Sequence, residues 1–150
     1  MTKLAMPKID RKLISKKNEV ITKLKKIVNT ENVLDHEDQI RPFETDALTA
    51  YKQKPLAVIF PENTEQVSKI LSYCNEQRIK VVPRGAGTGL SGGALPLADS
   101  ILLCLGKFNK IINIDYKNRC VVAQPGVTNL SITQAVEGNG FYYAPILPVK

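Results

Sequence analysis

The stretch PRGAGTGLSGGALP, residues 83–96, decides the fold, because five of the nine residues from 85 to 93 are glycine. It follows Lys80-Val81-Val82, whose paired valines are typical of a strand. Glycine at this density is unfavourable in a regular helix or strand, because glycine loses the most conformational freedom on folding. Successive backbone N–H groups that converge on an anion require positive φ angles and no Cβ in the way. The sequence therefore predicts a loop that binds phosphate groups.

Two common phosphate motifs fit this loop poorly. Residues 87–92 match the pattern G-x-G-x-x-G, but a Rossmann site needs a helix that opens at the loop, whereas Pro96 and an apolar run follow here. No Gly-Lys-Ser/Thr follows either, which excludes a Walker loop. What remains is a phosphate nest between two strands, with hydroxyl donors from Thr88 and Ser91 and a candidate charge partner in Arg84. A flexible surface loop is the alternative.

The residues before the loop predict a strand, a helix and a second strand. Residues 56–60 are apolar, and Asn63 can cap the following helix, with Gln66 closing a reciprocal capping arrangement. The apolar spacing continues to about Gln77, and the second strand covers residues 80–83. We expect a parallel unit with a right-handed crossover.

The residues after the loop predict three strands and a helix. Apolar runs at 101–105, 111–115 and 120–124 predict the strands, the last two as a hairpin. Thr128 or Asn129 can cap the final helix, and Gly138 or Gly140 can end it.

The positive charge lies at the beginning of the chain. The formal net charge is +7, and residues 1–30 hold nine Lys or Arg against two acids. Residues 11–29 predict an amphipathic helix, and residues 30–50 predict a polar connector. We interpret the lysines as a solvated face, with an anionic membrane or RNA as the alternative contact. A general nucleic-acid surface is not implied.

Few residues favour metal binding or catalysis. Cys74, Cys104 and Cys120 lie in separate apolar runs and are interpreted as reduced core cysteines. His36 is the only histidine and is expected in an exposed loop. We therefore predict no metal site, and a His-based catalytic triad is a poor candidate. Without a long apolar span or a signal-peptide core, the protein is expected in the cytoplasm.

From Leu56 to Ala144 the sequence resembles the FAD-linked oxidases of the p-cresol methylhydroxylase (PCMH) and vanillyl-alcohol oxidase type. Within that family it is most similar to glycolate oxidase flavin subunits and D-lactate dehydrogenases. The matching segments are residues 55–61 with Gln66 and Val67, residues 82–96, and residues 122–127. The resemblance implies an α+β fold, the first subdomain of a PCMH-type FAD-binding domain, with a small βαβ-containing sheet and flanking helices. This partial domain would span residues 51–150, after an N-terminal helix and connector in residues 1–50.

The resemblance also implies FAD as cofactor and a 2-hydroxy acid of the glycolate or D-lactate type as substrate, oxidised by hydride transfer. Residues around the FAD pyrophosphate would be Pro83, Arg84, Gly85, Ala86, Gly87, Thr88, Gly89, Ser91 and Gly92. Residues near the adenine half would be Pro125, Gly126 and Val127. A simple turn is the alternative for Pro125-Gly126.

The last residues depart from the family pattern. Family members continue after Pro145 with Asp-Pro-Ser-Ser-Gln, whereas this chain ends Ile-Leu-Pro-Val-Lys. Loss of one G from codons for the family residues yields this tail and a stop codon, so we expect a frameshifted, catalytically incomplete product, which the nucleotide sequence can check. The alternatives are a non-catalytic FAD- or nucleotide-binding module completed by a second chain, and the product of a decaying gene. Partner subunits could hold such a protein at a membrane.

Overall fold

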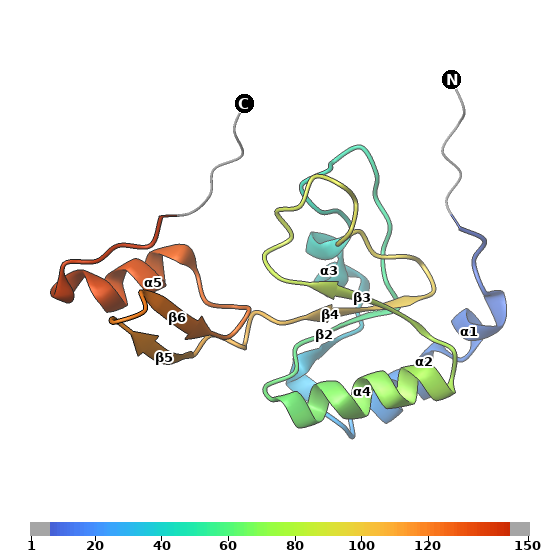
Figure 1. The fold of residues 1–150 in the computed structure, drawn as a ribbon. Helices are drawn as coiled ribbons and strands as arrows, with labels where there is room; N and C mark the ends of the chain where they lie inside the picture. Colours follow the sequence, from blue (N-terminus) through green and yellow to red (C-terminus); the bar gives the residue numbers. More distant parts are fainter. Residues whose placement is uncertain (1–6, 145–150) are drawn as a thin grey trace. The chain divides into compact units, whose positions relative to one another are not determined.

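The computed structural model describes residues 7–144 (Figure 1). The chain divides into two compact units, Met1–Leu105 and Gly106–Lys150, which are described separately. Residues 146–150, which carry the frameshift interpretation, lie outside the described part. The boundary expected at residue 50 stays a prediction.

A four-stranded mixed sheet forms the centre of the first unit. Its strands are β1 (Val33–Leu34), β2 (Ala57–Ile59), β3 (Lys80–Arg84) and β4 (Ser100–Cys104). The order is β1-β2-β4-β3, with β2 and β3 parallel to β4 and β1 antiparallel to β2. All five residues of β4 are buried. The predicted strands β2 and β3 therefore belong to one sheet, but β4 lies between them. The wholly buried strand β4 takes a central position, whereas β3 contains the exposed Pro83 and suits an edge.

Helix α4 (Thr64–Glu76) connects β2 to β3 and begins as predicted at Asn63. The Asn63 side chain accepts a hydrogen bond from the Gln66 N–H at 2.9 Å. The Gln66 side chain accepts from the N–H of Glu62 at 2.7 Å, one residue before the position expected for a reciprocal cap. Gln77 ends the helix, which confirms the predicted end.

The predicted N-terminal helix is present in two pieces, α1 (Arg11–Ser15) and α2 (Lys17–Leu24). The break at Lys16 follows Ser15, whose hydroxyl donates to the Lys12 carbonyl and competes with the helical backbone. The apolar stripe is confirmed, since its members Leu13, Val20, Ile21, Leu24 and Val28 are buried.

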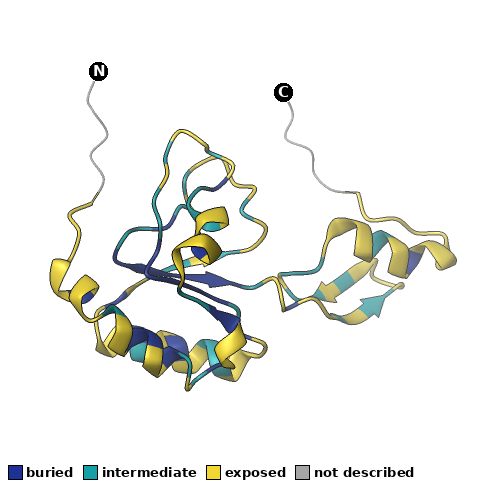
Figure 2. Ribbon diagram, turned by 180° about the vertical axis from the view of Figure 1, so that it is seen from behind, coloured by how far each residue is buried: buried dark blue, intermediate teal, exposed yellow. Residues whose placement is uncertain are grey.

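Helices cover the sheet on both faces. On one face Ala57, Ile59, Ile101 and Leu103 pack with the stripe of α1 and α2 and with α4. On the other face Val58, Leu102 and Cys104 pack with Ile40 and Phe43. These two residues belong to α3 (Glu37–Ile40) and a short 3-10 helix, Arg41–Phe43, and a further 3-10 turn, Thr30–Asn32, precedes β1. The polar connector expected at residues 30–50 is therefore a folded part of the first unit. Figures 1 and 2 show α4 and α3 on opposite sides of the buried strands.

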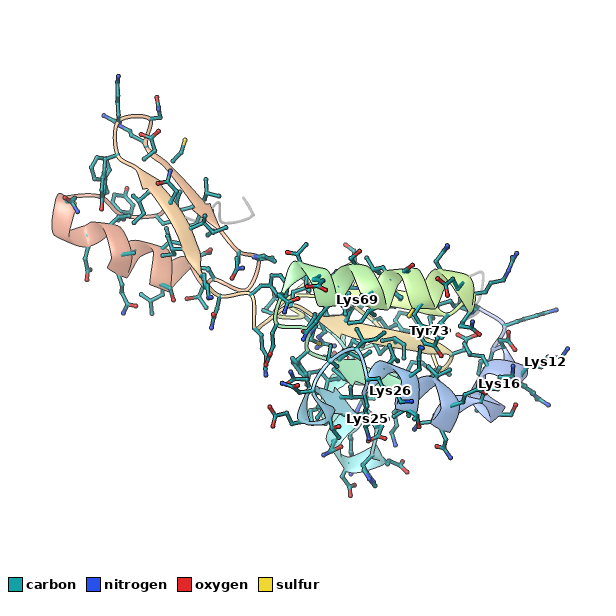
Figure 3. The ribbon with its side chains drawn as sticks, turned by 90° about the horizontal axis from the view of Figure 1, so that it is seen from below. Lys12, Lys16, Lys25, Lys26, Lys69 and Tyr73 are labelled. Atoms are coloured by element: carbon teal, nitrogen blue, oxygen red, sulfur yellow. The ribbon has the colours of Figure 1, made fainter. Side chains whose placement is uncertain are left out.

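Lysine side chains lie around the outer surface of the first unit's helices. Figure 3 shows Lys12 and Lys16 by α1, Lys25 and Lys26 just after α2, and Lys69 on α4. Lys25 pairs with Asp35 at 2.9 Å, and Lys69 pairs with Glu65. Lys12, Lys16 and Lys26 are exposed, as expected for a solvated face.

The second unit is a hairpin with a helix. Strands β5 (Ile111–Asp115) and β6 (Cys120–Ala123) pair antiparallel, as predicted. Thr128 caps α5 (Asn129–Val136), and a 3-10 turn, Glu137–Asn139, ends at Gly140 with φ +76°. Cys120 is exposed, so its assignment to the core is wrong, because a two-stranded hairpin leaves many of its side chains uncovered. Cys74 and Cys104 are buried as expected, and His36 is exposed.

Within residues 7–144, none of the helices is long and apolar enough to cross a membrane. The same residues contain no cluster of three or more His, Cys, Asp or Glu side chains that could hold a metal ion.

Candidate phosphate-binding site

The glycine loop, residues 85–94, leaves the carboxyl end of the edge strand β3. Gly87 and Gly92 have φ angles of +73° and +74°, a region that glycine enters without steric penalty. Thr88 and Ser91 are exposed on the same loop, so their hydroxyls are accessible, as the sequence predicts. The loop therefore combines the backbone angles and the polar side chains expected of a phosphate nest.

The backbone donors of the glycine loop are unoccupied by protein. Among the described residues, none accepts a hydrogen bond from the N–H groups of residues 85–94, and the first loop donor in use is Leu95, which bonds to Gly92 at 3.2 Å. Most residues of the loop are exposed, so these N–H groups are open to water or to a ligand. Together with the two positive φ angles, such a run of backbone donors can bind an anion.

A side chain at Gly87 would strain the backbone and would also displace the Arg84 guanidinium. A Cβ at this position would lie 2.6 Å from Nε of Arg84, which is closer than real Cβ contacts allow. By contrast, a Cβ at Gly85, Gly89 or Gly93 would meet no atom within 4 Å. Among these loop glycines, only Gly87 is fixed by both its φ angle and a close neighbour.

Arg84 braces the loop from the protein side. Its Nη1 donates to the carbonyl oxygens of Thr45 at 2.8 Å and Phe43 at 3.3 Å, and the guanidinium lies 5.7 Å from the Phe43 ring centroid. Ala47 N–H donates to the Gly87 carbonyl at 2.9 Å. The guanidinium that the sequence suggests as a charge partner is thus held by the preceding segment. Its positive charge lies beside Gly87, where it also favours a bound anion.

A buried carboxylate, Asp99, lies between the glycine loop and β4, directly before the strand begins. Asp99 accepts from Lys80 Nζ at 2.7 Å and from the Asp10 N–H at 2.8 Å. Burial alone would raise the pKa of Asp99, but these bonds outweigh burial and hold that pKa below its usual value. Burial raises the pKa of the Cys104 thiol to about 11, so this cysteine is an unreactive core residue.

The other predicted segment, residues 125–127, lies in the second unit. The Gly126 N–H donates to the Phe108 carbonyl at 2.7 Å, and the Val127 N–H donates to the Gln124 carbonyl at 3.1 Å. Pro125 has no N–H. The backbone donors of this turn are therefore used within the unit, in contrast to those of the glycine loop.

Sequence reasoning missed the segment that braces the loop. Phe43, Thr45, Asp46 and Ala47 precede the loop by about forty residues, in a polar stretch without periodicity. Asp46 is buried, with 4% of its surface exposed, and nothing in the local sequence distinguishes it from the exposed acids nearby. Burial of an acid in a polar connector has no signal in the chain itself.

Known proteins are similar in sequence to most of this chain. Residues 55–147 match the family described as FAD binding domain. The chain is 44% identical over 141 residues to the glycolate oxidase subunit GlcD of Escherichia coli K12, covering 94% of this chain and 27% of that protein. It is 35% identical over 128 residues to a D-lactate dehydrogenase of Anaerostipes hadrus, covering 85% of this chain and 27% of that protein. The chain thus spans about a quarter of the length of these relatives.

Solved structures show the same fold. The structure of p-cresol methylhydroxylase with substrate bound aligns with a TM-score of 0.73 at 27% identity, covering 88% of this chain and 26% of that one. The 4-ethylphenol oxidase of Gulosibacter chungangensis aligns with a TM-score of 0.75 at 25% identity, covering 91% and 27%. The predicted fold class, part of a PCMH-type FAD-binding domain, is confirmed.

Proposed function

This chain belongs to the FAD binding domain family, and from that premise we propose that it forms the FAD-binding portion of an oxidoreductase that acts on a 2-hydroxy acid. The observation that carries the proposal is the run of unpaired backbone donors at residues 85–94. The names of the relatives, a glycolate oxidase subunit and a D-lactate dehydrogenase, support the class of substrate.

In this proposal the glycine loop holds the FAD pyrophosphate. The loop N–H groups would donate to the phosphate oxygens, and Thr88 and Ser91 would add hydroxyl donors. Arg84, which lies beside Gly87, would add positive charge. The contacts would involve Pro83, Arg84, Gly85, Ala86, Gly87, Thr88, Gly89, Ser91 and Gly92. The donor set fits a pyrophosphate, which only accepts hydrogen bonds.

Pro125, Gly126 and Val127 are proposed to lie near the adenine half of FAD. Because the N–H groups of Gly126 and Val127 are used inside the second unit, their contribution would be shape and apolar contact. Bound FAD would supply the two-electron acceptor for a hydride from the hydroxyl-bearing carbon of the substrate. No residue of this chain is assigned a catalytic role.

The proposal is tested by titrating the purified chain with FAD and following flavin fluorescence. We expect saturable binding that ADP competes away, because ADP carries the same pyrophosphate. Absence of saturable binding, in a chain shown by circular dichroism to be folded, would contradict the FAD site.

A second candidate is a non-catalytic FAD module that a second chain completes. The observation that favours it is the apolar surface of the second unit, where Ile112 is 65%, Val122 is 52% and Leu130 is 66% exposed. If these side chains form one contiguous patch, that patch would suit a protein interface. If this second candidate is correct, co-expression with a polypeptide that covers the remaining family fold should yield a yellow, flavin-loaded complex without activity. Oxidation of glycolate or D-lactate by that complex, with an artificial electron acceptor, would favour the oxidoreductase.

A cytoplasmic location, with any membrane contact made through partner subunits, stays part of this proposal. The existence of partner subunits is supported by the name of one relative, which is described as a subunit.

A further inference from the structure

Residues 43–48 form a wall behind the glycine loop, and we refer to this segment as the connector wall. Arg84 bonds to the carbonyls of Phe43 and Thr45, and Ala47 bonds to Gly87. At the other positive-φ glycine of the loop, the position of a Cβ is 3.7 Å from Cδ2 of Leu48. In Figures 1 and 2 the segment after α3 and the loop after β3 lie on the same side of the sheet, opposite α4. The connector wall therefore reaches both bends of the loop.

Asp46 is the one acid of the connector wall that is buried, with 4% of its surface exposed. Its Oδ1 accepts from the Leu48 N–H at 2.9 Å. Its Oδ2 is buried and has no hydrogen-bond partner among the described residues. A buried polar atom without a partner costs about 1–3 kcal/mol, and more when it is charged. In the chain, Asp46 stands between Thr45, whose carbonyl is bonded to Arg84, and Ala47, whose N–H is bonded to Gly87.

The structure points to a ligand as the missing donor, and we propose that Asp46 is a cofactor-binding residue whose Oδ2 accepts a hydrogen bond from a sugar-type hydroxyl of the dinucleotide. The inference rests on the proposed FAD site. An ionised carboxylate only accepts hydrogen bonds, as phosphate oxygens do, so the two repel each other. The group beside Asp46 is therefore the part of the ligand next to the pyrophosphate that carries hydroxyl donors.

This assignment gives the two walls of the site complementary roles. The glycine loop offers its unpaired backbone donors, and it takes the phosphates. The connector wall offers an acceptor, and it takes a hydroxyl on one side of them. Carboxylates recognise ribose hydroxyls in the same way in dinucleotide sites of other folds. FAD has two such sources, the ribose of its adenosine half and the ribityl chain of its flavin half.

The competing explanation is that Asp46 only closes the local turn through Leu48. Asp46→Asn separates the two roles, because the amide oxygen keeps the bond to the Leu48 N–H while the second acceptor is lost. Asp38→Asn is the matched control, since Asp38 is an exposed acid of α3.

The test measures binding of FAD, ADP, FMN and inorganic pyrophosphate to the whole 150-residue chain as wild type and both variants, together with the unfolding midpoint without ligand. We expect Asp46→Asn to weaken FAD binding at least tenfold, to leave pyrophosphate binding unchanged or stronger, and to keep the unfolding midpoint. Asp38→Asn should match the wild type throughout. A loss that appears with ADP identifies the ribose, and a loss that appears with FMN identifies the ribityl chain.

Two results would overturn the inference. FAD binding by Asp46→Asn at wild-type affinity would contradict the proposed contact between Asp46 and the ligand. An equal loss for all four ligands, with a lower unfolding midpoint, reduces Asp46 to a structural residue. A wild-type chain that fails to bind FAD refutes the proposed function itself and the inference with it, so the two failures are distinguished by the wild-type measurement.

Discussion

The glycine loop in the first unit and the turn at residues 125–127 in the second unit share two features, since both follow a strand and both contain glycine. They differ in what their backbone donors do. The loop leaves the N–H groups of residues 85–94 unpaired within the described structure, whereas Gly126 and Val127 donate to carbonyls of their own unit. Under the proposed function, the first arrangement leaves donors for a ligand, whereas the second uses its donors to close a turn. In that proposal, free backbone donors distinguish the binding loop from the turn.

The largest effect is expected from Gly87→Val. The branched side chain cannot adopt φ +73° without strain of about 1–3 kcal/mol, and its Cβ would collide with the Arg84 guanidinium. We expect FAD affinity to fall on the order of 100-fold or more, measured by fluorescence titration. Gly93→Ala is the matched control, because a Cβ there meets no atom within 4 Å, and its affinity should stay within about twofold. FAD binding by Gly87→Val with the affinity of the wild type would contradict the assignment of the loop as a phosphate nest.

An intermediate effect is expected in amide hydrogen exchange, which compares the two loops directly. Without ligand, amides 85–94 should exchange rapidly, while those of Gly126 and Val127 should be protected by their hydrogen bonds. FAD at about 100 times its Kd should slow exchange in the glycine loop by up to about 100-fold. Mass spectrometry of the corresponding peptides checks this. Protection by FAD confined to residues 124–127 would reverse the assignment of the two loops.

The smallest effect is expected from Thr128→Ala, directly after the turn at residues 125–127. The Thr128 hydroxyl accepts from the Ser131 N–H at 3.1 Å and caps α5. Its loss should lower the free energy of unfolding by about 1 kcal/mol, measured by urea denaturation, without changing exchange in the glycine loop. Gln134→Ala, at an exposed position of the same helix, should change neither property. A change in loop exchange would mean that the two segments are coupled.

Local patterns in the sequence predicted most of the elements. The apolar spacing gave α4 with its cap at Asn63, and the paired apolar runs gave the hairpin of β5 and β6. Strand order was not predictable in this way, since the position of β4 between β2 and β3 depends on pairing between distant segments. The two-residue strand β1 was missed because two residues carry no period.

The candidate site was predicted in the same uneven way. Glycine density identified the loop, because the required φ angles restrict which residues can occupy it. The connector wall could not be identified, because its contribution is made through the carbonyls of Phe43 and Thr45, and any residue has a carbonyl. Contacts made by particular side chains can be predicted from the sequence, whereas contacts made by backbone carbonyls cannot.

The bonds from Arg84 to the connector wall also bear on the order of folding. The contact between Arg84 and Phe43 joins residues 41 positions apart. The sheet depends on a contact at a still greater separation, since Ala57 of β2 pairs with Ile101 of β4. Because the entropy of loop closure grows slowly with loop length, the two contacts cost similar amounts of chain entropy. We therefore expect the connector to dock on Arg84 together with the assembly of the sheet, and not after it.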